Sequence, residues 1–172
     1  MVAANAVVQP MGLYSNKIHS LDDIKADTKI AIPNDPSNGG RALVLLEKAG
    51  IIKLKPDYKG EASIHDVAEN PRGVKLVELE AAQLPISLQD LDVACVPMNY
   101  AVSGGLDVNK QGFYFESRDA KYALIIIAAR PDNVQSPEVQ TFVKCYQSPE
   151  VAAFIKEKFK GQINPAWEQP AK

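Results

Sequence analysis

The residues whose types and spacing could do chemistry lie in a short turn-rich segment that ends in Gly39, Gly40 and Arg41, where a helical pattern begins. A helix N-terminus offers free backbone N–H groups and a positive partial charge, and glycines let a ligand approach the backbone closely. The guanidinium of Arg41 can bind a carboxylate through two parallel hydrogen bonds. The segment therefore suits a small carboxylate ligand. The alternative is a capped helix in which Arg41 pairs with a nearby acid such as Asp35.

Catalytic and metal-binding patterns are not evident. The two histidines, His19 and His65, lie in polar stretches without a Ser or Cys nucleophile in a recognisable motif. No His, Cys and carboxylate residues have the spacing of a metal site. The Gly39-Gly40-Arg41 triplet lacks the Lys-Ser/Thr pair of a phosphate-binding P-loop. We therefore expect no enzyme, no metal and no cofactor.

The elements around the glycine pair alternate between strands and helices. Strands are expected at residues 29–32, 74–79 and 92–96, and helices at residues 42–49, 63–70 and 81–88. This alternation predicts parallel strands with helical crossovers, which make an α/β lobe. The continuous apolar run at residues 122–129 predicts a strand that is buried on both faces.

Two Ser-Pro-Glu triplets, at residues 136–138 and 148–150, predict the starts of two further helices. Each triplet places Ser at the N-cap, Pro at the first helical position and Glu in the first turn, where the helix dipole favours an anion. The tail after residue 162 looks loose, and Trp167 is its expected anchor.

The composition of the 172-residue chain is that of an ordinary globular protein, with 46% apolar and 23% charged residues and a formal net charge of −2. Without a basic stripe, nucleic acid is not an expected partner. No run approaches the roughly 18 apolar residues of a membrane span. Cys95 and Cys145 lie in apolar stretches, which leaves open two buried thiols or one disulfide.

The N-terminal stretch Met1–Pro10 is apolar but carries no positive charge and no small-residue cleavage pattern. It is therefore not expected to be a secretory signal, and it contains no cysteine that could be lipidated. As written, the chain is expected to stay in the cytoplasm unless an upstream segment has been removed.

Several motifs that follow one another in the same order resemble those of the NlpA/MetQ family of methionine-binding proteins. The motifs are IAIPNDPSNGGRAL at residues 30–43, LLEKAGIIKL at 45–54, VELEAAQLP at 77–85, NYA at 99–101 and YQSPEV at 146–151. The resemblance implies the substrate-binding component of an ABC importer for methionine or a related amino acid. It also implies an ABC permease as partner, and the lipid-anchored, extracytoplasmic location of the family.

The resemblance further implies a two-lobed periplasmic-binding-protein fold of type II, with one complete lobe plus the C-terminal part of the other. Residues 1–27, including the strand near Gly12, would form a strand of incomplete lobe one plus a linker. Residues 28–101 would form the complete α/β lobe two. Residues 102–172 would return to lobe one with two C-terminal helices and a tail. Family members carry a further segment before this point, which supplies the opening strands of lobe one and the pocket for the ligand's side chain.

Three site residues are expected from the resemblance. Arg41 matches the family's carboxylate-binding Arg, Asn38 lies in the same loop and would support it, and Asn99 belongs to the matched Asn-Tyr-Ala motif. At two positions the chain departs from the family: Pro97 and Leu124 stand where the family has an Asn that hydrogen-bonds the polar end of the amino acid. Losing one buried hydrogen-bonding partner costs roughly 1–3 kcal/mol, so impaired binding is expected.

Two functions therefore stay open. The first is a solute-binding protein with weakened binding, and the second is a non-binding remnant or interaction module. Lobe one without its opening strands should expose a sheet edge and one face of residues 123–129. Uncovered apolar strands pair with other chains, so self-association or the capture of a partner strand is expected.

Overall fold

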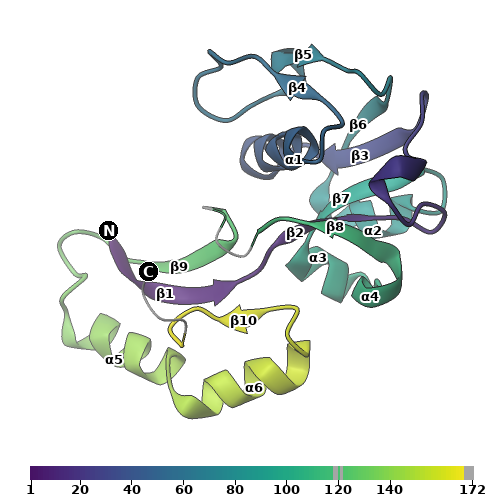
Figure 1. The fold of residues 1–172 in the computed structure, drawn as a ribbon. Helices are drawn as coiled ribbons and strands as arrows, with labels where there is room; N and C mark the ends of the chain where they lie inside the picture. The colour runs from purple at the N-terminus through teal and green to yellow at the C-terminus, as the bar shows by residue number, and fades with distance from the viewer. Residues whose placement is uncertain (118–119, 121, 169–172) are drawn as a thin grey trace. The chain divides into compact units, whose positions relative to one another are not determined.

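The computed structural model describes residues 1–117, 120 and 122–168, which form two compact units (Figure 1). Unit 2 is the continuous segment Met11–Glu116, and unit 1 combines Met1–Pro10 with Ser117–Lys172. The end of the predicted tail, residues 169–172, lies outside the described residues.

Unit 2 is built on a five-stranded sheet with the order β6-β3-β7-β2-β8. Its strands are β2 (Met11–Tyr14), β3 (Lys29–Pro33), β6 (Lys75–Leu79), β7 (Val93–Pro97) and β8 (Gly112–Phe115). β3 pairs in parallel with both β6 and β7, whereas β2 pairs antiparallel with β7 and β8. The parallel strands expected from the sequence are thus confirmed at the centre of the sheet.

Helices and short strands complete unit 2. They are α1 (Pro36–Lys48), α2 (Leu84–Ser87), α3 (Met98–Ser103), α4 (Val108–Gln111), β4 (Lys53–Leu54) and β5 (Val67–Glu69). The core forms where α1 meets β3, because Leu43 and Leu46 of the helix and Ile30 and Ile32 of the strand are all fully buried. This apolar contact fixes α1 on the sheet.

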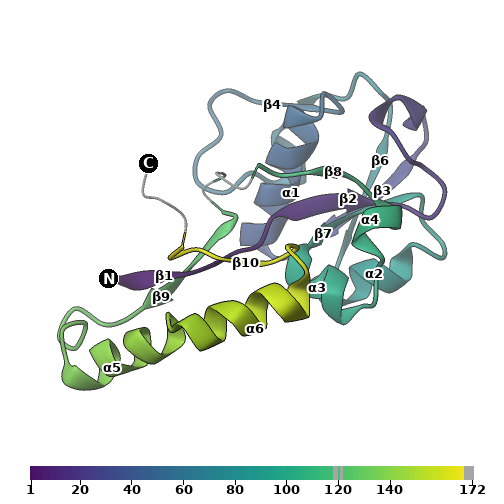
Figure 2. The same ribbon diagram turned by 60° about the horizontal axis from the view of Figure 1, so that its bottom comes forward.

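Unit 1 contains a three-stranded antiparallel sheet with the order β10-β1-β9. Its elements are β1 (Val2–Val8), β9 (Leu124–Ala128), α5 (Pro137–Tyr146), α6 (Pro149–Phe159) and β10 (Asn164–Pro165). Helix α5 contacts β1, and α6 contacts β10 (Figure 2).

The predicted starts of the two C-terminal helices are confirmed. The side chains of Ser136 and Ser148 cap α5 and α6 by accepting hydrogen bonds from the backbone N–H groups of Val139 and Val151. Trp167 contacts Tyr146 of α5 edge to face, with ring centroids 5.6 Å apart, in line with its expected role as the anchor of the tail.

Three expectations differ from the structure. The helix expected at residues 63–70 is a single 3₁₀ turn, Ile64–Asp66, followed by β5. The turn ends because β5 pairs with β4, where Glu69 lies opposite Lys53. The strand near Gly12, expected in lobe one, is β2 of unit 2, where Gly12 lies opposite Val96 and Phe115. Residues 102–116, also expected in lobe one, belong to unit 2 as well, because β8 pairs with β2.

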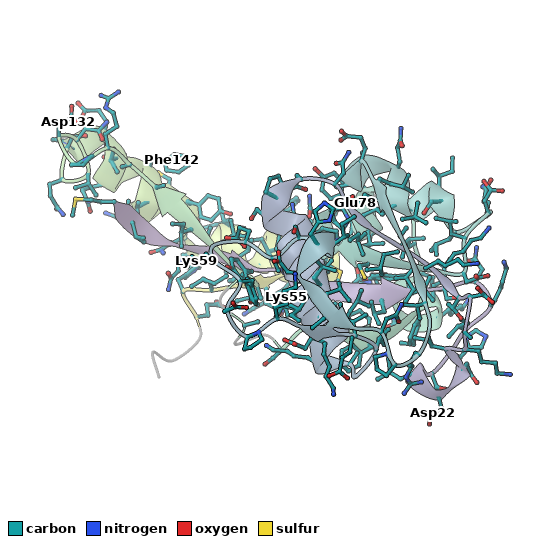
Figure 3. The ribbon with its side chains drawn as sticks, turned by 90° about the horizontal axis from the view of Figure 1, so that it is seen from above. Asp22, Lys55, Lys59, Glu78, Asp132 and Phe142 are labelled. Carbon is teal, nitrogen blue, oxygen red and sulfur yellow. The ribbon has the colours of Figure 1, made fainter. Side chains whose placement is uncertain are left out.

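The third difference is the exposure of β9. The sequence predicts burial on both faces, but Leu124 is 37% and Ile126 is 42% exposed. In unit 1, β9 pairs with β1 on one side and is the terminal strand of its sheet. Helix α5 also carries an exposed aromatic ring, since Phe142 is 56% exposed (Figure 3). The second expectation for this strand, an exposed face and a sheet edge, thus agrees with the structure.

Both cysteines are free thiols, which decides the alternative that the sequence leaves open. Cys95 is fully buried in β7, and burial raises the pKa of its thiol. Cys145 is exposed. Among the described helices, none has the length and apolar character needed to cross a bilayer.

Candidate functional site

One edge of the unit 2 sheet gathers the residues that the sequence singles out. Because β3 and β7 are parallel neighbours, their carboxyl ends lie at the same edge, and α1 and α3 begin there. Asn38 and Arg41 lie in the first two turns of α1, and Asn99 lies in the first turn of α3. In open α/β sheets, ligands bind outside the carboxyl ends of the strands, so this edge is the candidate site.

Arg41 forms a buried ion pair with Glu116, the last residue of unit 2. Its Nε lies 2.9 Å from Oε2 and 3.2 Å from Oε1 of Glu116, and its Nη2 lies 2.5 Å from Oε2. The two side chains are only 6% and 7% exposed. Arg41 therefore holds a carboxylate in the two-pronged manner expected for a carboxylate-binding Arg.

The identity of this partner is not the one that the sequence suggests. Asp35 is the acid close to Arg41 in the sequence, but it serves as the N-cap of α1 and accepts the backbone N–H of Asn38 at 2.9 Å. Glu116 is separated from Arg41 by 75 positions, so no local spacing signals the pair. Its place directly after a strand that ends at the same edge could have pointed to it.

Glu116 also closes the sheet at this edge. Its Oε2 accepts the backbone N–H of Met11 at 3.1 Å, and its own N–H donates to the carbonyl oxygen of Met11 at 2.8 Å. One carboxylate thus connects α1 to the start of β2 and the end of β8.

Asn38 and Asn99 have separate surroundings. The side-chain amide of Asn38 donates to both carboxylate oxygens of Asp35, at 3.2 Å and 3.1 Å, and so reinforces the cap of α1. Asn99 is exposed at the second position of α3. Asn38 and Arg41 thus donate to different carboxylates, and Asn99 is exposed to solvent.

The glycine pair allows close backbone packing, a role that the sequence interpretation of ligand approach does not include. A Cβ atom at Gly39 would lie 2.7 Å from the carbonyl oxygen of Pro33, and one at Gly40 would lie 3.0 Å from the backbone N and O of Ala62. The glycines let α1 sit directly on the end of β3 and on the loop around Ala62.

A Gly39→Ala variant is expected to lower the free energy of unfolding by about 1–3 kcal/mol, because the added methyl group forces α1 away from β3. Urea unfolding followed by circular dichroism measures this change. Ser37→Ala, at an exposed position two residues earlier in the same helix, should stay within about 0.5 kcal/mol of the wild type. Equal effects of the two substitutions would show that the close approach does not matter.

A shallow pocket of about 180 Å³ lies beside the start of α1. Its lining residues are Ile32, Asn34, Asp35, Pro36, Gly39, Gly40, Leu43, Glu61, Ala62, Ser63 and Glu78. The carboxylates of Asp35, Glu61 and Glu78 would repel an anionic ligand, and Figure 3 labels Glu78. Within the described parts of the chain, no group of three or more His, Cys, Asp and Glu side chains could hold a metal ion. This pocket is therefore a poorer candidate than Arg41 for a carboxylate.

The two positions where the resemblance leads us to expect asparagine lie in different surroundings. Pro97 is buried at the end of β7 and takes the N-cap position of α3, without a side-chain hydrogen bond to the helix. Leu124 lies at the start of β9 and is opposite Val8 of β1. Neither side chain can donate or accept a hydrogen bond.

The sequence pattern of one family, described as NlpA lipoprotein, matches residues 1–167. The chain belongs to the NlpA lipoprotein family. This membership confirms the resemblance found in the sequence. The family consists of methionine-binding lipoproteins that are substrate-binding proteins of ABC transporters, and not of enzymes.

Individual members of the NlpA family can be aligned with nearly the whole of this chain. The D-methionine-binding lipoprotein MetQ of Escherichia coli K12 is 41% identical over 97% of this chain and 62% of its own length. The probable D-methionine-binding lipoprotein MetQ of Vibrio cholerae is 39% identical over 96% of this chain and 61% of its own length. The chain thus spans about 61% of the length of these curated relatives.

Solved structures of NlpA relatives show the same fold. A nutrient binding protein from Burkholderia cenocepacia bound to methionine is 44% identical, with a TM-score of 0.89 over 96% of this chain and 70% of that protein. The chain therefore has the α/β fold of MetQ-type binding proteins, over about 70% of their length.

Proposed function

We propose that this chain is the substrate-binding component of an ABC importer and that its ligand is methionine or a related amino acid. The observation that carries the proposal is the ion pair of the buried Arg41 with a carboxylate, at the edge where the parallel strands end. A 44% identical protein with this fold was solved with methionine bound, and this likeness supports the choice of ligand.

In this proposal Arg41 binds the carboxylate of the amino acid. Asn38 supports the loop in front of it by fixing Asp35 at the cap of α1, and Asn99 offers an exposed amide at the same sheet edge. The fold is of type II, with unit 2 containing the complete lobe and unit 1 the C-terminal part of the other lobe. The ABC permease is the protein partner.

Binding is expected to be weaker than in a member that has both asparagines. Pro97 and Leu124 offer no hydrogen bond to the ligand, and each missing partner costs roughly 1–3 kcal/mol. The second candidate function, a non-binding remnant or interaction module, is favoured by the exposed apolar side chains of β9.

Titration calorimetry with L-methionine, D-methionine and a few other amino acids tests the proposal. Micromolar or tighter binding that is lost in Arg41→Ala, while circular dichroism shows that the variant is still folded, would support the solute-binding function. The matched control is Arg72→Ala, since Arg72 donates to the backbone carbonyl of Leu21, away from the sheet edge, and this variant should bind as the wild type does. No heat at millimolar ligand would favour the remnant scaffold.

Self-association through β9 is the second part of the proposal. Uncovered strands pair with one another, so a concentration-dependent dimer or larger species is expected in sedimentation at tens of micromolar. Ile126→Lys places a charge on the exposed face of β9 and should shift the protein towards monomer. Ile86→Lys, which changes an isoleucine of α2 that is 64% exposed, is the control and should leave the association unchanged. A monomeric wild type would contradict this part.

A further inference from the structure

Both chain connections between the units leave unit 2 from the same place. One connection follows Pro10 and enters unit 2 at Met11, and the other leaves unit 2 after Glu116. Met11 and Glu116 are joined by two hydrogen bonds, one from the backbone N–H of Glu116 and one to its side chain. The first and last residues of unit 2 are therefore hydrogen-bonded to each other.

The Glu116 carboxylate that accepts the hydrogen bond from Met11 also forms the ion pair with Arg41. Its Oε2 accepts hydrogen bonds from Nε and Nη2 of Arg41 and from the backbone N–H of Met11. When several donors share one acceptor oxygen, each donor weakens the hydrogen bonds of the others. This effect is larger in the protein interior, where the dielectric constant is low. A change in what the guanidinium binds must therefore change the hydrogen bond of Met11.

We propose that Glu116 is a positioning residue, which orients the Arg41 guanidinium and relays its bonding state to Met11 and hence to both connections between the units. The ligand part of this inference rests on the proposed function. A ligand carboxylate that shares the guanidinium withdraws part of it from Glu116, and the Met11 N–H then becomes the stronger partner of Oε2.

The ligand-free arm of the test measures amide hydrogen exchange at Met11. Glu116→Gln keeps the shape of the side chain but removes its charge, and hydrogen bonds to a charged acceptor are roughly twice as strong as neutral ones. We expect exchange at Met11 to become about tenfold faster or more in this variant. Glu69→Gln is the matched control, because it removes the charge from an exposed ion pair with Lys53 and should leave Met11 unchanged.

Arg41→Lys provides a second variant if Glu116→Gln does not fold. It keeps the positive charge but replaces the two-pronged contact by a single ammonium group, and the Met11 amide should shift and exchange at a different rate. A merely structural role of Glu116 would change exchange throughout the unit 2 sheet. The relay predicts a change concentrated at Met11 and Glu116. Unchanged exchange at Met11 in both variants would overturn the inference, and so would a uniform change across the sheet.

The ligand arm adds L-methionine to the wild-type chain and follows the Met11 amide by nuclear magnetic resonance. A downfield shift that saturates with the calorimetric binding curve supports the relay. Binding heat without any change at Met11 overturns the relay and leaves the proposed function standing. Absence of binding heat refutes the proposed function, while the exchange measurements still decide whether Glu116 links Arg41 to the connections.

Discussion

Arg41→Met is expected to lower the free energy of unfolding by about 3–5 kcal/mol, because it leaves the Glu116 carboxylate buried without its cation. The Glu116 side chain is only 7% exposed, so water cannot replace the lost partner. Since a domain has about 5–15 kcal/mol of stability in total, the variant should be close to unfolding. Urea unfolding of the full chain, followed at the far-ultraviolet signal, measures the loss.

A double variant separates stability from binding. Arg41→Met with Glu116→Gln removes both charges but keeps an acceptor for the N–H of Met11. Replacing both members of a buried pair is often close to neutral, so the double variant should regain most of the lost stability and still fail to bind methionine. A double variant as unstable as Arg41→Met alone would show that the ion pair itself contributes the stability.

Pro97→Asn should raise methionine affinity by about tenfold, since one added hydrogen bond of about 1.4 kcal/mol corresponds to that factor. Position 97 is the N-cap of α3, where Asn is among the preferred residues. Titration calorimetry of the variant with L-methionine measures the gain.

The control for this gain is the alanine substitution at the same position. Pro97→Ala removes the same side chain without supplying a hydrogen bond, and its calorimetric affinity should equal that of the wild type. A gain in the alanine variant would assign the effect to the relief of steric exclusion. No gain in either variant would mean that this position does not contact the ligand.

Local patterns predicted the elements near the site better than their partners. Helix α1 follows from the apolar spacing of residues 42–49, but it begins at Pro36, inside the segment expected to be a turn, because Asp35 caps it there. β3 and β7 follow from their short apolar runs. The unit boundaries do not follow from such patterns. β2 pairs with β7 and β8, which are distant in the sequence. The residues of this short strand near Gly12 do not indicate which sheet it belongs to.

The site shows the same division. Arg41 could be singled out because a glycine pair and a cation at a helix start are visible in a few residues. Glu116 could not be assigned to it, because the contact depends on how β8 closes the sheet. Gly39 could be singled out because it has no side chain. The sequence alone does not show that the backbone of Pro33 lies next to it.

The split composition of unit 1 bears on how the chain folds as it is made. β1 is synthesised before unit 2, but its partner β9 follows only after all of Met11–Glu116 has been synthesised. At about 5–20 residues per second, this delay lasts on the order of ten seconds. Unit 2, whose two ends are hydrogen-bonded to each other, can close on its own during that time.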